Sequence, residues 1–408
     1  MNRKLESAEF DVLVAGAGPV GQIAALAVSR LGLSVALVGP TAPPDRRTTA
    51  LMAPALEFLE NIGVGPLPEH ATAALRSMRI IDGTRRLIRS APVTFHAGEV
   101  GEDAFGYNIA NADLTALLAE RIAAQPAISR FEAMVGEWMM GDVSNVASLD
   151  HGSQISASLT IAADGRNSPA RTAAGITAAF RPYPQAALVL NFSHSRDHGF
   201  VSTEFHTETG PFTVVPLPGK RSSLVWVVSP EEADSLKALD DPALSARIEA
   251  RMQSLLGAVT VEAGRQIFPL GSLSPSSMAA RRTVLVGEAA HVLPPIGAQG
   301  MNLGIRDVAV LVRILTDQPV DPGSEAVLAS YRSARRLDVM ARSGAVDLLN
   351  RSLLTGFLPL QMVRSAGLSL LSAAAPLRGF VMREGLLPGS GWADIGSALR
   401  KKVGRQQS

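Results

Sequence analysis

The sequence predicts an α/β fold, in which an antiparallel β-sheet is inserted into a Rossmann-like domain and helices follow at the C-terminus. Near the N-terminus, a glycine-rich turn joins an apolar strand to an alanine-rich helix. Between residues 187 and 229, several short segments alternate between polar and apolar side chains, which is typical of antiparallel strands. A buried strand and a helix return between residues 283 and 315, so the first domain is expected to resume there.

The individual elements follow from periodicity. Apolar runs predict strands, and apolar residues spaced three or four apart predict helices. In the first domain we expect strands at 10–15, 34–38, 156–163 and 283–287, and helices at 22–31, 51–62, 113–124 and 304–315. In the inserted sheet we expect strands at 187–192, 201–206, 211–217 and 222–228, and beyond the first domain we expect helices to about Phe380.

Composition excludes several classes of protein. The chain has 408 residues, 47% hydrophobic and 18% charged, which is typical of a globular protein with a large core. Its formal net charge of +1 gives no field to hold nucleic acid, so that partner is not expected. The absence of cysteine excludes disulfides, thiolate catalysis and iron–sulfur clusters, and the histidines show no metal-binding spacing. Redox chemistry, if the protein performs any, would therefore need a bound cofactor.

The sequence predicts neither an exported nor a membrane-spanning protein. The first nine residues are polar and charged, so no secretory signal is expected and the cytoplasm is the expected location. The most apolar region, residues 352–377, is interrupted by Pro359 and Arg364. Its uncharged stretches are shorter than the roughly 18 residues that span a bilayer, so a transmembrane helix is not expected there.

The glycine-rich turn has a specific chemistry. Gly16-Ala17-Gly18-Pro19-Val20-Gly21 is a GxGxxG motif between a predicted strand and a predicted helix. The first glycine permits a tight turn, the second lets a pyrophosphate approach the backbone, and the third packs the helix on the strand. The motif predicts dinucleotide binding. The acid that usually follows about 20 residues later, and that accepts the ribose hydroxyls, is missing. Gly39 stands in its place, and Asp45 or Thr41 could substitute only in part.

Two further motifs follow predicted strands. Asp164 begins a D-G-x-x-S-x-x-R sequence, whose plainer interpretation is a solvent-exposed turn in which the Asp accepts backbone N–H groups. Gly287-Glu288 follows the strand near residue 285 and leads through a stretch rich in Pro and Gly into a helix. Backbone N–H groups at that helix start can face a flat ring that carries negative charge.

With these motifs in this order, the chain resembles the flavoprotein aromatic monooxygenases with the para-hydroxybenzoate hydroxylase fold, and more narrowly the UbiH/UbiF hydroxylases of ubiquinone biosynthesis. The residues that match the signature after the family's G-D-A-A-H are Pro295, Ile296, Gly297, Gln299, Gly300, Asn302, Gly304 and Asp307. The sequence departs from the family at Glu288, Pro294 and Ala298, where the family has Asp, His and Gly. Arg47 matches the arginine of the family's D-x-R-x-x-A-L; its alternative interpretation is an ordinary solvated arginine.

The resemblance implies a glutathione-reductase-type FAD-binding domain, with FAD as cofactor and NAD(P)H as transient co-substrate. O2 would react through a C4a-hydroperoxyflavin, and one oxygen atom would pass to an aromatic, prenylated phenol or quinone precursor. No side chain is assigned as a catalytic acid or base. The residues that the motifs assign to the cofactor are Gly16, Ala17, Gly18, Pro19, Val20, Gly21, Arg47, Asp164, Gly287, Glu288, Pro295, Gly297, Gln299, Gly300, Met301 and Asn302.

The resemblance also predicts a division into domains. Residues 1–75, 100–175 and 278–330 would form the discontinuous FAD-binding domain, residues 76–99 and 176–277 the substrate-binding sheet domain, and residues 331–408 a C-terminal helical region. The apolar C-terminal helices and basic tail suit peripheral contact with the inner membrane face. A helical cap over the core or a homodimer contact is the alternative. Two other functions stay open: a flavin monooxygenase acting on a soluble aromatic compound, and a non-catalytic scaffold subunit of a biosynthetic complex.

Overall fold

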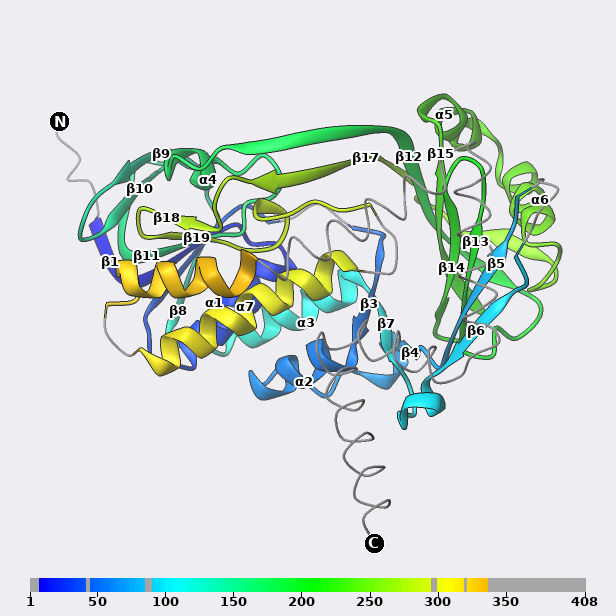
Figure 1. The fold of residues 1–408 in the computed structure, drawn as a ribbon, viewed down its shortest axis with the longest axis horizontal. Helices are drawn as coiled ribbons and strands as arrows, with labels where there is room; N and C mark the ends of the chain where they lie inside the picture. The colour runs from blue at the N-terminus through cyan, green and yellow to red at the C-terminus, as the bar shows by residue number, and fades with distance from the viewer. Residues whose placement is uncertain (1–6, 42–44, 85–89, 295–298, 319–320, 337–408) are drawn as a thin grey trace, which may run out of the picture.

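Two large β-sheets stand side by side, joined by the long strands β12 (Ala178–His194) and β17 (Gln266–Pro275) (Figure 1). The computed structural model describes residues 7–41, 45–84, 90–294, 299–318 and 321–336. Within these ranges, no helix is both long enough and apolar enough to span a membrane.

The first sheet has eight strands, in the order β18-β19-β11-β1-β2-β8, and β10 pairs with both β11 and β9. Strands β19, β11, β1, β2 and β8 run parallel. Val12, Leu13 and Val14 at the centre are fully buried, as expected of a strand covered on both faces. The strands are β1 (Ser7–Ala15), β2 (Val35–Val38), β8 (Ile128–Phe131), β9 (Val135–Met140), β10 (Asn145–Leu149), β11 (Gln154–Ala162), β18 (Ala279–Ala280) and β19 (Thr283–Leu285).

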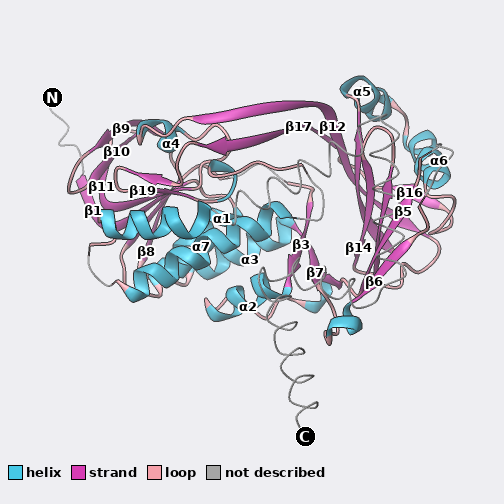
Figure 2. Cartoon of the chain, in the orientation of Figure 1, coloured by secondary structure: helices cyan, strands magenta, loops and turns pink. Residues whose placement is uncertain are grey.

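Helices cover one face of this sheet. Helix α1 packs against both α3 and α7 on that face (Figure 2). Residues 325–336 are also helical, and Tyr331 in this segment donates a hydrogen bond from its hydroxyl to Leu285 O, 2.7 Å away at the end of β19. The helices of this part are α1 (Pro19–Ser29), α2 (Ala53–Asn61), α3 (Asn111–Ala123), α4 (Pro169–Ala173), α7 (Gln299–Asp317) and the 3₁₀ turn η3 (Gly287–Ala289).

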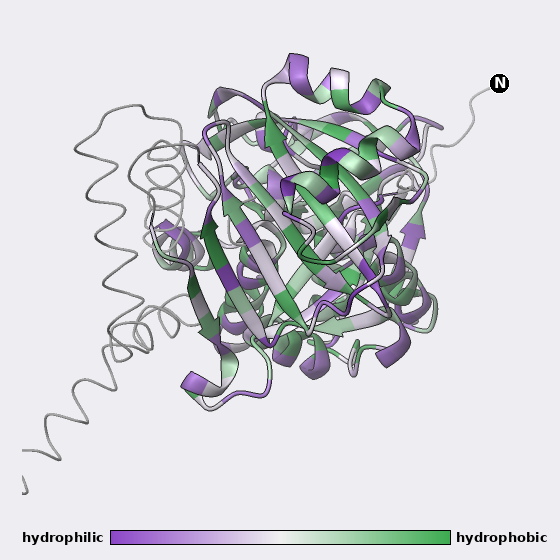
Figure 3. Ribbon diagram, turned by 90° about the vertical axis from the view of Figure 1, so that its right-hand side faces the viewer, coloured by the Kyte–Doolittle hydropathy of each residue, from purple (hydrophilic) through white to green (hydrophobic). Residues whose placement is uncertain are grey.

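The second sheet has the order β16-β12-β15-β14-β13-β5-β6, with β17 paired to β12. Helices α5 and α6 pack on its outer face, where hydrophobic residues of the strands form a core with them (Figure 3). The remaining strands are β5 (Ser77–Asp82), β6 (Val93–His96), β13 (Val201–His206), β14 (Pro211–Leu217), β15 (Arg221–Val228) and β16 (Val259–Val261), and the helices are α5 (Pro230–Ala238) and α6 (Asp241–Arg251).

A small three-stranded sheet lies between the two large ones (Figure 1). Its order is β3-β7-β4, and both outer strands pair antiparallel with β7. Strands β4 and β7 also contact β14 of the second sheet. The elements are β3 (Thr48–Met52), β4 (Thr72–Ala74) and β7 (Gly106–Ala110), with the 3₁₀ turns η1 (Glu69–Ala71) and η2 (Ala97–Val100) nearby.

The structure confirms the α/β fold with an antiparallel sheet inserted after a βαβ opening, and it corrects some boundaries. The helix predicted from residue 51 is wrong at its start, because residues 48–52 form β3 and pair with β7; α2 begins at Ala53, one residue before Pro54, which favours a helix start. Helix α7 begins at Gln299, five residues earlier than predicted. The strand predicted to reach Gly287 ends at Leu285, because Gly287 turns with φ +59° into η3.

The predicted C-terminal helices are described only as far as residue 336, and the rest of that prediction lies outside the described residues. The domain boundaries stay predictions.

Candidate functional site

The glycine-rich loop follows β1 at the carboxyl edge of the first sheet. Gly16 adopts φ +108°, and a Cβ added there would lie 2.3 Å from Ala163 O, so only glycine fits. Gly21 is equally restricted, because an added Cβ would lie 1.9 Å from Gly16 O. The loop therefore lies directly against the backbone at the end of β11.

The start of α1 is open to a ligand. Gly18 is the N-cap residue and Pro19 follows it; no side chain caps the helix and no acidic residue occupies its first turn. A Cβ added at Gly18 would meet no atom within 4 Å. The first N–H groups of a helix have no acceptor within the helix, and the helix dipole makes this end positive. This donor set and the space above it fit a pyrophosphate.

The Asp164 motif forms a tight turn beside this loop. The Asp164 carboxylate accepts hydrogen bonds from the Ser168 hydroxyl and from Ala170 N, the latter at 3.0 Å. Burial raises the pKa of Asp164, and these two hydrogen bonds offset part of that effect. Arg171 extends from the turn and donates to Ala289 O at 2.9 Å. The Asp164 carboxylate therefore stabilises this turn, and Arg171 connects the turn to η3.

A buried ionic network connects η3 to α7. Asp307 on α7 is fully buried, and its Oδ2 accepts hydrogen bonds from Gly287 N at 2.9 Å and from His291 Nε2 at 2.7 Å. Its Oδ1 accepts from Arg335 Nε at 2.7 Å. The packing is tight, since a Cβ added at Gly304 would lie 2.9 Å from Val20 Cγ2. The network therefore links the Gly287 turn to α7 and to the helical segment 325–336, and Val20 of α1 packs against the same turn.

Arg47 lies near Glu288, which belongs to η3. Arg47 Nη2 lies 2.8 Å from Asp45 Oδ2, and Arg47 Nη1 lies 3.9 Å from Glu288 Oε1. The guanidinium also lies over the Phe268 ring of β17, with Cζ 4.9 Å from the centroid. Burial lowers the pKa of Arg47, but the ionic partners outweigh it and raise the value overall. Arg47 therefore links Asp45 and Glu288 to the second sheet through Phe268.

The first turn of α7 is anchored to β3 by Asn302. Asn302 Nδ2 donates to Ala50 O at 2.7 Å, and its Oδ1 accepts from Met52 N at 2.9 Å, so this helix start is fixed to β3. Met301 packs partly buried against the core, and a Cβ added at Gly300 would meet no atom within 4 Å. Gln299 begins the helix. Pro295 and Gly297 lie outside the described residues.

Comparison with known proteins identifies the family. Residues 9–343 match the family described as "FAD binding domain". The chain belongs to this family. It is 31% identical to the ubiquinone hydroxylase UbiL of Rhodospirillum rubrum, over 92% of this chain and 89% of the relative. It is 29% identical to the 3-demethoxyubiquinol 3-hydroxylase of Escherichia coli, over 90% of this chain and 96% of the relative. The protein is thus a flavin-dependent monooxygenase with FAD as its cofactor.

Solved structures share the fold. Pseudomonas aeruginosa PqsL, in complex with 2-aminobenzoylacetate, gives a TM-score of 0.74 at 23% identity, covering 88% of this chain and 99% of that one. Klebsiella pneumoniae HpxO, complexed with FAD and uric acid, gives 0.75 at 18% identity, covering 94% and 97%. The chain therefore shares the fold of these two proteins.

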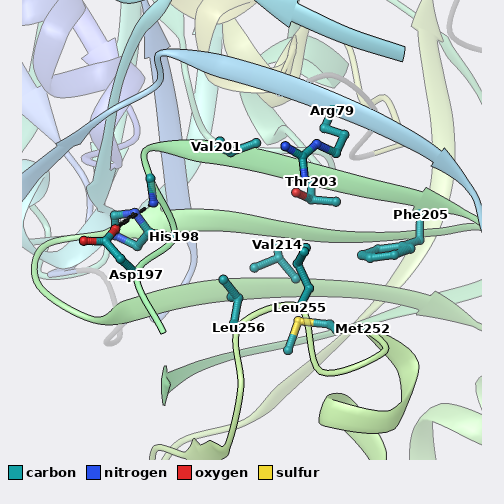
Figure 4. Close-up of a pocket in the computed structure, with 11 residues that line it drawn as sticks. Arg79, Asp197, His198, Val201, Thr203, Phe205, Val214, Met252, Leu255 and Leu256 are labelled. Carbon is teal, nitrogen blue, oxygen red and sulfur yellow. Dashed lines mark hydrogen bonds and ion pairs between the residues drawn. The ribbon is translucent and has the colours of Figure 1, made fainter. Parts of the chain in front are cut away.

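A separate pocket lies on the outer face of the second sheet. It has a volume of about 190 Å³ and is lined by residues that include Thr203, Phe205, Val214, Met252 and Leu256 (Figure 4). Several of these side chains belong to the core that the sheet forms with α5 and α6. The pocket is therefore separated from the cofactor loops by the sheet itself.

Sequence reasoning did not identify the pairing within the buried network. Asp307 was only a position of the family's signature, and neither His291 nor Arg335 was assigned a partner. The sequence offers little indication of this ion pair, because Asp307 and Arg335 are 28 residues apart and come together only when their helical segments pack.

Proposed function

We propose that this monooxygenase hydroxylates the aromatic ring of a prenylated phenol or quinone precursor in ubiquinone biosynthesis. The ring, O2, NAD(P)H and a proton would give the hydroxylated ring, NAD(P)⁺ and water. The main support is the similarity to the UbiL ubiquinone hydroxylase along nearly the whole of both chains. A second support is an apolar surface on the inner face of the second sheet, next to Arg47.

That surface follows from strand alternation. On β12, Ala186, Leu188 and Leu190 point into the outer core, so Ala187 and Val189 point to the opposite face. In the register of the sheet, Ala187 lies between Val227 on β15 and Phe268 on β17. A row of apolar side chains thus runs across the inner face and ends under the Arg47 guanidinium.

An apolar surface beside the cofactor loops suits an aromatic ring with a hydrocarbon tail, because both gain free energy when they leave water. FAD, when bound, supplies the redox chemistry that accepts a hydride from NAD(P)H and transfers one oxygen atom of O2 to the ring. The protein would position the substrate and exclude water from the reacting atoms.

The cofactor would be held by the residues that the motifs assigned. Backbone N–H groups of the Gly16–Gly21 loop would bind the pyrophosphate. Arg47 and the turn at Gly287 and Glu288 would lie along the flavin, with the start of α7 facing its ring. This arrangement is supported by the open helix start at Gly18 and by the anchoring of Asn302 to β3.

A prenylated substrate partitions into a membrane, so the proposal includes peripheral contact with the inner membrane face from the cytoplasm. A homodimer or a biosynthetic complex could present the substrate in the same way. Fractionation of cells that express the full chain, with and without a high-salt wash, tests this part separately from catalysis.

The central experiment uses the purified full chain. Its visible spectrum is recorded after gel filtration, and NAD(P)H oxidation is then followed in air with a short-chain prenylated phenol or with an unprenylated phenolic acid. The proposal predicts retained FAD and a hydroxylated prenylphenol that carries oxygen from isotopically labelled O2. Hydroxylation of the phenolic acid alone would favour a soluble aromatic substrate. A protein that retains no flavin even in excess FAD would refute catalysis and favour the scaffold function.

A further inference from the structure

The end of β2 lacks the acid that dinucleotide-binding folds use to hold the adenosine ribose. Gly39 occupies that position, and the structure shows why no side chain fits there. A Cβ added at Gly39 would lie 2.8 Å from Ala17 N and 3.2 Å from Ala17 Cβ. The glycine-rich loop itself fills the space, so the ribose hydroxyls need an acceptor from another element.

Neither substitute suggested by the sequence provides that carboxylate. Asp45 is held by Arg47, through Nε at 3.0 Å and Nη2 at 2.8 Å, and it also accepts a hydrogen bond from Asn111 Nδ2 at 2.8 Å. Thr41 directs its hydroxyl toward another residue, since its Oγ1 donates to Glu132 Oε1 at 2.8 Å. This hydrogen bond points to Glu132 as a third candidate for the acceptor of the ribose hydroxyls.

Glu132 lies on the neighbouring strand at the same level as Gly39. Strand β8 runs parallel to β2, with Val38 opposite Phe131, and Gly39 N donates to Phe131 O at 3.1 Å. The next residue, Glu132, thus stands beside Gly39 at the carboxyl edge of the sheet, and it is exposed. Adjacent strands lie about 4.8 Å apart, a distance that the glutamate side chain can span.

We propose that Glu132 accepts the hydrogen bond from the adenosine 2′-hydroxyl of FAD, and that Thr41 orients its carboxylate. The acceptor has moved from the end of β2 to the end of β8. Thr41 engages one carboxylate oxygen, which fixes the side chain and leaves the second oxygen to face the ligand. The proposal rests on FAD binding and makes no use of the proposed aromatic substrate.

The test measures binding. Apoprotein is titrated with FAD, and with an FAD analogue that carries 2′-deoxyadenosine, while flavin fluorescence is followed. The variants are Glu132→Gln and Thr41→Val, and the matched control is Glu137→Gln, an exposed carboxylate on β9. A hydrogen bond to a charged acceptor corresponds to roughly a tenfold change in Kd.

Wild-type protein and the Glu137→Gln control should bind FAD about tenfold more tightly than the deoxy analogue. Glu132→Gln should bind both flavins with the weaker affinity, and Thr41→Val should fall between. If Glu132→Gln still distinguished the two flavins as wild type does, the carboxylate would not contact the hydroxyl and the proposal would be wrong. Failure of the proposed function would look different: FAD would bind with the expected discrimination while no prenylphenol was hydroxylated.

Discussion

The Asp307 network allows a quantitative prediction. Asp307→Asn keeps the shape of the side chain but removes its charge. The Arg335 guanidinium, whose side chain is 1% exposed, would lose the carboxylate that lies 2.7 Å from both its Nε and its Nη2. Leaving one member of a buried ion pair uncompensated costs about 3–5 kcal/mol. The amide also has one acceptor oxygen for the Gly287 and His291 donors and for Arg335 together, so at least one buried donor loses its acceptor.

Urea unfolding, followed by circular dichroism, measures this loss. The expected decrease of about 3–5 kcal/mol is a large part of the 5–15 kcal/mol by which such folds are stable. Asp317→Asn, at the exposed C-terminal end of α7, is the control and should change stability by less than about 0.5 kcal/mol. Adding Arg335→Met to Asp307→Asn removes the buried cation and should recover part of the stability. An Asp307→Asn protein within about 1 kcal/mol of wild type would refute the proposed role of this ion pair.

Three further predictions concern the same region. Gly304→Ala should weaken FAD binding, because the added methyl would lie 2.9 Å from Val20 Cγ2 and 3.2 Å from Gly287 Cα. A second change, Val20→Ala, removes the first of these contacts and should restore part of the affinity in the same titration. Arg47→Lys should raise the Kd for FAD about tenfold, because lysine cannot make the paired contacts with Asp45, and an unchanged Kd would contradict this role. Burial raises the pKa of Tyr331 well above 10.0. The unfolded chain therefore releases this proton first, stability should fall as pH rises above 10.0, and Tyr331→Phe should reduce that fall.

The local parts of the fold could be predicted from the sequence. The Gly16–Gly21 loop has glycine at positions where a Cβ would clash with the backbone. The glycine pattern that predicts this turn lies within six consecutive residues, so the sequence alone reveals it. The same holds for the second sheet, whose strands alternate between polar and apolar residues. Strand β3 was missed because Leu51 also fits a helical spacing, and only its pairing with the distant β7 decides for a strand.

Relations between distant elements could not be predicted in this way. The sequence shows that Gly39 cannot supply an acid, but it does not show that β8 lies next to β2, because about 90 residues separate Thr41 from Glu132. The parallel register brings Phe131 beside Gly39 and so determines which carboxylate reaches the same edge of the sheet. A missing motif residue is therefore weak evidence against cofactor binding: the acceptor is needed at a place in space, and any strand that ends there can provide it.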